Sequence, residues 1–246
     1  MALAPENSLQ AFGNALSIGV TTLELDVHIS VDGAPVVTHD RVLPDGEYVA
    51  WTAREHLPFC TLDEVFALCD QRGADDVRFN IETKFDAIHP DEGSPRERFA
   101  EVVARTVDAA GTAGRCSIQS FDWACLDLVA DADPRLGLNV LTNVAYWEVG
   151  EVGPSPWMAG VDIDDFGGSV VAAAAGRGYD ALSPAFALVT RSFVADAHTA
   201  GLKVIPYTVN EVADLERCVD LGCDGFITNH PDRARDVLAS RGITLP

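Results

Sequence analysis

Positive charge is scarce in this chain. Its 17 lysines and arginines stand against 38 acidic residues, which gives a formal net charge of −21 at pH 7. Such an excess of negative charge opposes nonspecific attraction to nucleic acid and to anionic membrane surfaces. The composition therefore predicts no nucleic-acid partner and no stable membrane association. Only two basic residues are lysines, Lys84 and Lys203, so the position of each is informative.

Long hydrophobic runs and paired cysteines are also missing. No stretch approaches the roughly 18 consecutive apolar residues of a membrane-spanning helix, and the first residues do not have the form of a signal peptide. We therefore expect a cytoplasmic protein. The six cysteines show neither Cys-x-x-Cys spacing nor a regular framework, which predicts free and mostly buried thiols.

Linkers and low-complexity segments are absent as well. The chain has 246 residues, 48% of them hydrophobic, which is enough for the core of one large α/β domain. We expect a single domain over residues 1–246. A loop excursion over residues 41–60, marked by Pro44, Asp45-Gly46 and Pro58, interrupts its early part.

One hairpin of the sequence, residues 22–40, carries an unusual set of polar side chains. Leu23 to His28 alternates apolar and polar residues with a period of two, so Glu24, Asp26 and His28 share one face of a predicted strand. Two carboxylates roughly 7 Å apart are costly to bury without a cation. A hard, oxygen-preferring metal ion would remove this cost. The alternative interpretation is an exposed acidic edge strand with a chance histidine.

Further strands alternate with amphipathic helices, as in parallel β/α architectures. Asn7 with Gln10, and Thr61 with Glu64, have the spacing of capping boxes at the start of two helices, and we expect Asn210 to cap another.

One of these strands, Val77 to Lys84, repeats the polar pattern and places Glu82 and Lys84 on one face. The predicted strands number seven, and they are residues 23–28, 77–84, 116–121, 136–142, 180–183, 202–209 and 225–228. A closed (β/α)₈ TIM barrel has eight strands and begins with one. We therefore expect such a barrel with a first strand missing before Ala4. A doubly wound open sheet is the alternative, although no Gly-rich phosphate loop follows an early strand.

Polar residues gather at the carboxyl ends of these strands, where TIM barrels carry their active sites. Asn210 is one of them. Phe121 and Tyr207, also at strand ends, could line an apolar pocket for the organic part of a substrate. The hairpin adds His39 as a possible proton carrier.

Eight short motifs follow one another in the order seen in glycerophosphodiester phosphodiesterases, which the chain resembles over nearly its whole length. They are Pro5-Glu6-Asn7-Ser8, Glu24-Leu25-Asp26-Val27, Asp32-Gly33, His39-Asp40, Ile81-Glu82-Thr83-Lys84, Ser120-Phe121, Thr208-Val209-Asn210 and Asp224-Gly225-Phe226-Ile227-Thr228.

The resemblance implies a TIM barrel that hydrolyses glycerophosphodiesters, a small-molecule substrate class, to sn-glycerol 3-phosphate and an alcohol with Ca²⁺ or Mg²⁺. It implies that Glu24, Asp26 and Glu82 bind the metal. It further implies that His39 is one of two acid/base histidines and that Lys84 lies near the phosphate.

The chain also departs from the family. A strand ending in His-Arg-Gly, which supplies the second histidine, normally precedes the Pro-Glu-Asn motif, and we expect it to be the same strand that the count of strands finds missing. Two alternatives to hydrolysis follow. One is a catalytically impaired or silent barrel that binds metal and phosphate ligands, and the other is a phospholipase D-like phosphodiesterase.

Overall fold

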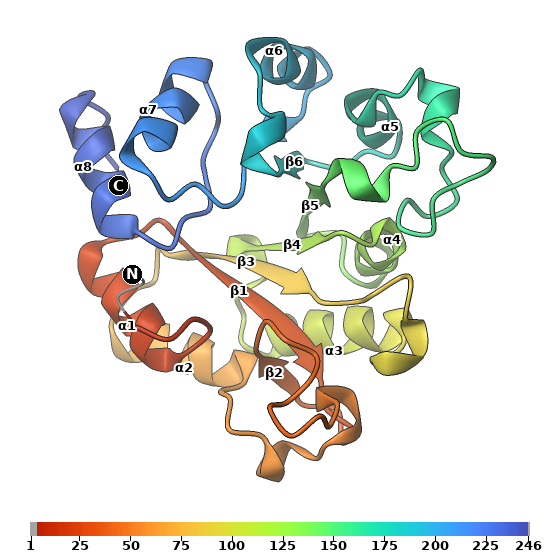
Figure 1. Cartoon of the computed structure of the whole chain (residues 1–246). Coiled ribbons are helices and arrows are strands. Elements are labelled where there is room, and N and C mark those ends of the chain that lie inside the picture. The colour runs from red at the N-terminus through yellow and green to blue at the C-terminus, as the bar shows by residue number, and fades with distance from the viewer. Residues whose placement is uncertain (1–3, 246) are drawn as a thin grey trace. The chain divides into compact units, whose positions relative to one another are not determined.

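A computed structural model describes residues 4–245 of the chain (Figure 1). They form two compact units, the first ending at Gly137 and the second beginning at Leu138. Every helix within residues 4–245 is too short or too polar to cross a lipid bilayer. The strand expected before Ala4 lies outside the described residues. Both that strand and the single domain over residues 1–246 stay predictions.

The first unit contains a four-stranded sheet in the order β2-β1-β3-β4. Strands β1, β3 and β4 are parallel, whereas β2 returns antiparallel to β1 as the second arm of a hairpin. The strands are β1 (Thr22–Ile29), β2 (Pro35–Val37), β3 (Arg78–Thr83) and β4 (Cys116–Ser120). The helices are α1 (Leu9–Ile18), α2 (Leu62–Gln71), α3 (Arg96–Ala109) and α4 (Trp123–Ala132).

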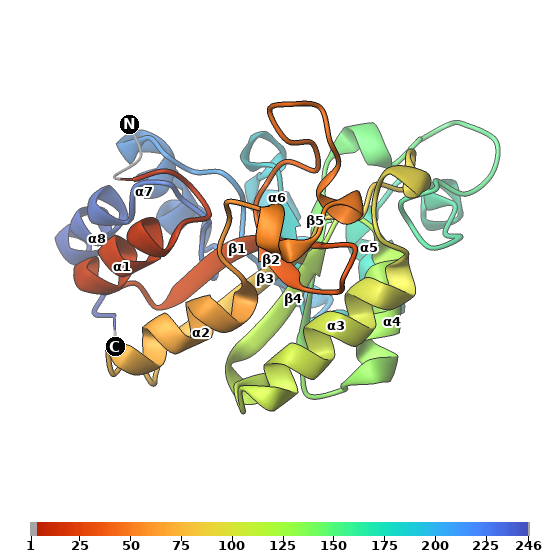
Figure 2. The ribbon, with the colours of Figure 1, turned by 90° about the horizontal axis from the view of Figure 1, so that it is seen from below.

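The period-two pattern gives this sheet two different faces. Leu25 of β1 and Phe79 and Ile81 of β3 are fully buried, and the ring of Phe79 packs edge-on against Phe66 of α2, with 4.8 Å between centroids. Helices α2 and α3 cover this face (Figure 2). Burial of the apolar face therefore fixes which way the alternate, polar side chains of β1 and β3 point.

The excursion over residues 41–60 has a small core of its own. It contains two short 3₁₀ helices, η1 (Val49–Trp51) and η2 (Arg54–His56). Val49 and Leu57 are buried against Val36 of β2. The excursion is thus anchored to the hairpin that carries His39.

The second unit continues the alternation of strands and helices. Strands β5 (Gly137–Thr142), β6 (Ala181–Pro184) and β7 (Lys203–Val204) are parallel to one another in that order. The helices are α5 (Val170–Gly176), α6 (Arg191–Thr199), α7 (Val212–Leu221) and α8 (Pro231–Ser240). The α/β class predicted from the sequence is confirmed.

Two predicted strands of this unit are shorter or absent. The strand expected over residues 202–209 is limited to Lys203–Val204, and residues 225–228 are not a strand. These residues still bond to neighbouring backbone, as Val209 N donates to Ile227 O at 2.8 Å and Ile227 N donates to Pro206 O at 2.9 Å. Pro206 has no N–H to continue the ladder.

Some helix N-termini are capped by the residues that the sequence predicts, and others are not. Thr61 and Glu64 form the expected capping box at α2. Asn7 was expected to cap α1, but Ser8 does so by accepting from Ala11 N. The expectation that Asn210 caps α7 was also wrong, because Glu211 occupies that position without a side-chain bond.

Asp122 is the cap with the largest expected effect on stability. It is fully buried, accepts from Cys125 N at 2.8 Å at the start of α4, and binds Arg96 through two bonds of 2.8 Å. Asp122→Ala should lower the free energy of unfolding by about 2–4 kcal/mol, because both a cap and a charge-assisted pair are lost. Asp122→Asn, which keeps an acceptor oxygen, should lose less.

Urea unfolding measures the difference. The control is Glu101→Ala, which removes an exposed partner of Arg105 and should cost no more than about 0.5 kcal/mol. Equal losses for Asp122→Ala and Glu101→Ala would contradict the role assigned to Asp122.

Candidate metal and phosphate site

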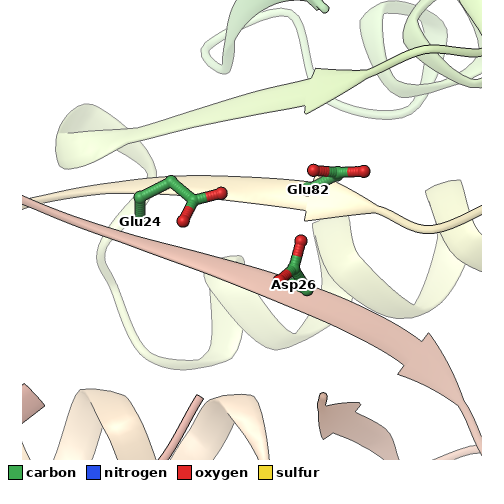
Figure 3. Close-up of side chains that lie close together, drawn as sticks. All are labelled: Glu24, Asp26 and Glu82. Atoms are coloured by element: carbon green, nitrogen blue, oxygen red, sulfur yellow. The ribbon is translucent and has the colours of Figure 1, made fainter. Parts of the chain in front are cut away.

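Three carboxylates meet on the polar face of the first sheet. The parallel register pairs Asp26 of β1 with Glu82 of β3. Glu24 lies two residues before Asp26 on the same face of β1, opposite Asn80. One carboxylate oxygen from each of Glu24, Asp26 and Glu82 lies within 4.8 Å of the other two, and the three side chains point toward one another (Figure 3). Asp26 and Glu82 are buried, and Glu24 is partly exposed.

A chain of hydrogen bonds from the neighbouring strands holds Glu24 in place. Ser117 Oγ donates to Asn80 Oδ1 at 2.9 Å. Asn80 Nδ2 donates to Gln119 Oε1 at 2.6 Å. Gln119 Nε2 then donates to Glu24 Oε1 at 2.6 Å. The three supporting side chains carry no net charge, so they orient the carboxylate without neutralising it.

Asn7 supports Asp26 from outside the sheet. Its Nδ2 donates to Asp26 Oδ2 at 2.8 Å, and its Oδ1 accepts from Asp26 N at 3.1 Å. Asn7 has a φ of +52°, in the left-handed region that asparagine tolerates better than most residues. The segment before α1 is thus hydrogen-bonded to the carboxylate cluster through Asn7.

Lys84 provides a positive charge beside the cluster. Its Nζ lies 3.0 Å from Glu82 Oε1 and 3.6 Å from Asp26 Oδ1, with the side chain only 16% exposed. Burial lowers the pKa of Lys84, but Glu82 and Asp26 outweigh burial and leave the pKa above its ordinary value. The ammonium is therefore charged at neutral pH and available to an anionic group.

One ammonium does not balance three carboxylates. Burial raises the pKa of Glu24 well above its ordinary value, and Asp26 and Glu82 raise it further. Burial likewise raises the pKa of Glu82, to about 8, against the opposing effect of Lys84. In the absence of a cation, the cluster therefore retains protons at neutral pH.

The donor set fits a hard divalent cation. Carboxylate oxygens are the ligands that Ca²⁺ and Mg²⁺ prefer. Burial, and after it the neighbouring carboxylates, raise the pKa of Glu24 and Glu82, so a bound cation would stabilise their ionised forms. Glu24, Asp26 and Glu82 would hold the ion. Of the residues predicted as metal ligands, the structure thus brings all three together.

His39 lies at the exposed end of the hairpin. Its side chain is 55% exposed, and its Nδ1 is 2.9 Å from Asp40 Oδ1. The buried His28 supports the same segment, since its Nε2 lies 3.3 Å from His39 O. Burial lowers the pKa of His28 to about 4, so this ring is neutral at pH 7 and donates the bond from Nε2.

The three predicted substrate residues other than Lys84 are divided between the two units. Phe121 follows the end of β4 in the first unit and is half-buried. Tyr207 and Asn210 belong to the second unit. There Tyr207 Oη donates to Thr142 O at 3.3 Å, and Asn210 Oδ1 accepts from Asn229 N at 2.9 Å.

The sequence did not reveal how Asn7 and Asn80 support the site. Asn7 stands 19 residues from Asp26, and its position before α1 resembles that of a helix cap. The position of Asn80 could have been predicted, because a polar residue two positions before Glu82 lies on the same face of the strand. Gln119 was visible only as one of several polar residues at strand ends.

The family model, a relative and a solved structure that match this chain name the same family. The model of the glycerophosphoryl diester phosphodiesterase family matches residues 1–50 and 45–233. A glycerophosphodiester phosphodiesterase of Caldanaerobacter subterraneus subsp. tengcongensis is 26% identical over 261 residues, which cover 97% of this chain and 94% of the relative.

Solved structures show the same fold. One from Silicibacter pomeroyi DSS-3, assigned to the glycerophosphoryl diester phosphodiesterases, is 27% identical with a TM-score of 0.83 and covers 98% of this chain and 91% of its own. An Oleispira antarctica phosphodiesterase, solved with the product sn-glycerol-3-phosphate, is 19% identical with a TM-score of 0.74 over 96% and 92% of the two chains. The chain thus has a TIM-barrel-like α/β fold.

The carboxylate cluster should make stability depend on pH. Between its usual pKa near 4.5 and its folded pKa of about 8, Glu82 holds a proton in the folded protein that the unfolded chain releases. In the presence of chelator, the free energy of unfolding should therefore fall as the pH rises from about 5 to about 8. One such group contributes a slope of at most about 1.4 kcal/mol per pH unit.

Urea unfolding at several pH values gives this slope. Glu82→Gln should flatten it, whereas Glu101→Gln, at an exposed position on α3, should keep the wild-type slope. An equal slope in wild type and Glu82→Gln would show that Glu82 ionises normally.

Proposed function

The chain belongs to the glycerophosphoryl diester phosphodiesterase family, and on that premise we propose that it hydrolyses glycerophosphodiesters to sn-glycerol 3-phosphate and an alcohol with a divalent cation, Ca²⁺ or Mg²⁺. Water is added across one P–O bond, so that the phosphoryl group keeps the glycerol and releases the other alcohol.

This proposal rests on opposite charges that lie close together on one face of the sheet. Glu24, Asp26 and Glu82 offer oxygen ligands within 4.8 Å of one another, while Lys84 lies 3.0 Å from Glu82. A phosphodiester needs both features, because its negative charge must be met by positive charge and its reacting oxygens must be oriented.

Each charged group then has a separate task. A bound cation supplies charge that stabilises negative charge developing on the phosphoryl oxygens. Lys84 Nζ binds a phosphoryl oxygen, exchanging part of its interaction with Glu82 for one with the substrate. Gln119 and Asn7 keep the carboxylates of Glu24 and Asp26 oriented, as supporting bonds do around metal ligands.

His39 carries the proton in this scheme. Its ring is exposed at the end of the hairpin, and the 2.9 Å contact of its Nδ1 with Asp40 Oδ1 holds the orientation of the ring. The Nε2–H then donates to the oxygen of the leaving alcohol as the P–O bond breaks. The bond between His28 and His39 O restrains the backbone of the proton donor.

The organic part of the substrate requires apolar and neutral polar contacts. Within the first unit we assign these to Phe121. Tyr207 and Asn210, which belong to the second unit, stay sequence-based predictions for the same role. The product found with the Oleispira antarctica phosphodiesterase supports the choice of sn-glycerol 3-phosphate as the compound to measure.

The first test is the release of sn-glycerol 3-phosphate from a glycerophosphodiester by purified protein. Chelator should abolish release, and Ca²⁺ or Mg²⁺ should restore it. Glu24→Gln and Glu82→Gln should each lower kcat/KM by at least about 10²-fold, because each removes a ligand charge while keeping the shape. Glu101→Gln serves as the matched control and should retain wild-type activity. Turnover that survives complete chelation would rule out the proposed site.

The second test concerns the proton donor. His39→Asn should lower kcat by about 10²–10⁴-fold with little change in KM, because a general acid acts in the transition state. His56→Asn is the control, since His56 is an exposed histidine of the neighbouring excursion over residues 41–60, with its Nε2 3.5 Å from Glu55 Oε1. Steady-state kinetics would contradict the assignment if both variants kept the wild-type kcat. Binding of cation and sn-glycerol 3-phosphate without any turnover would instead identify a silent barrel.

A further inference from the structure

Two cysteines lie together at the end of α7, far in sequence from the carboxylate cluster. Cys218 is in the last turn of the helix and Cys223 is the second residue beyond it. The two thiols interact, because each shifts the pKa of the other. Both side chains contact the same apolar cluster, which includes Leu215 and Val237.

The helix end fixes this contact through its backbone. Cys223 N donates to Cys218 O and Gly222 N donates to Val219 O, each at 3.1 Å, and Gly222 has a φ of +80°. This is a Schellman motif, in which the two residues now occupied by cysteines normally make a hydrophobic contact. The next residue is held as well, because Asp224 N donates to Val204 O at 2.9 Å.

The two thiols differ in access and acidity. Cys218 is fully buried, whereas Cys223 is half-buried and reachable from solvent. The interaction with Cys218 lowers the pKa of Cys223, and the same interaction raises the pKa of Cys218. Cys223 is thus the thiol that ionises first.

We propose that Cys218 and Cys223 form a dithiol site that reacts with low-molecular-weight disulfides and closes into an intramolecular disulfide. The Cys223 thiolate attacks one sulfur of the small disulfide, which breaks its S–S bond, expels one thiolate and leaves a mixed disulfide on Cys223. Cys218, losing its proton, then attacks the Cys223 sulfur and expels the second small thiolate. The protein dithiol is oxidised, one small disulfide is reduced to two thiols, and the two protons end on those thiols.

Cys60 provides a matched comparison. It is half-buried like Cys223, but its thiol donates to Asn7 O at 3.6 Å, and burial raises its pKa. A half-exposed thiol with a raised pKa should react slowly with disulfides, whereas a half-exposed thiol activated by a second thiol should react quickly.

The experiment treats the native, reduced protein with glutathione disulfide and follows it by intact mass and by peptide mapping after alkylation. Wild type should lose two hydrogens, with Cys218 and Cys223 joined. Cys218→Ser should stop at one glutathione on Cys223, and Cys223→Ser should leave Cys218 unmodified. Cys60→Ser should behave as wild type. Cys223 should react at least about tenfold faster than Cys60.

Three results would overturn the proposal. They are a wild-type protein that keeps glutathione on Cys223 without closing the disulfide, Cys60 reacting before Cys223, and a Cys218–Cys223 disulfide that forms only in denaturant. Because peptide mapping of wild type alone distinguishes these results from the expected one, the test holds even if a variant folds poorly. It measures no hydrolysis, so it is independent of the proposed phosphodiesterase activity.

Discussion

Repulsion among three carboxylates is the constraint around which the first unit is arranged. Glu24, Asp26 and Glu82 offer oxygens within 4.8 Å of one another, at a position where burial raises the pKa of Glu24 and Glu82. Such a cluster lowers the stability of the folded chain unless protons or cations compensate it. Neutral residues would stabilise the fold better at these positions. The arrangement therefore indicates a site that binds a cation at the expense of stability.

The surrounding residues hold the carboxylates without neutralising them. Gln119 and Asn7 donate amide N–H groups to Glu24 and Asp26, which fixes the oxygens and leaves their charge. Among residues 4–245, Lys84 adds the positive charge next to the cluster, and its Nζ lies 3.0 Å from Glu82 Oε1. The sheet makes this possible because its other face, packed with residues such as Leu25 and Phe79, is buried by helices. Burial of the apolar face of the sheet thus directs the charged side chains to the opposite face.

Local pattern was sufficient to predict which residues share a face, but not which residues touch. The alternation from Leu23 to His28 placed Glu24 and Asp26 correctly, and the sequence Thr61-Leu62-Asp63-Glu64 predicted a capping box that the structure contains. The contact of Asn7 with Asp26 depends on a backbone turn with φ of +52° and on a partner 19 residues away, and no local period encodes either. The predicted strand over residues 225–228 failed for a related reason. Its apolar residues are those of a strand, yet their bonds go to the irregular backbone around Pro206.

The central claim is that the carboxylate cluster is a cation site whose protons leave when the ion enters. Calorimetric titration of Ca²⁺ or Mg²⁺ into cation-free protein near pH 7, repeated in buffers of different ionisation enthalpy, measures both binding and proton release. Because the pKa of Glu82 is about 8 and that of Glu24 is also raised, at least about one proton should be released for each ion bound. Absence of binding, or binding with no proton release, would contradict the account.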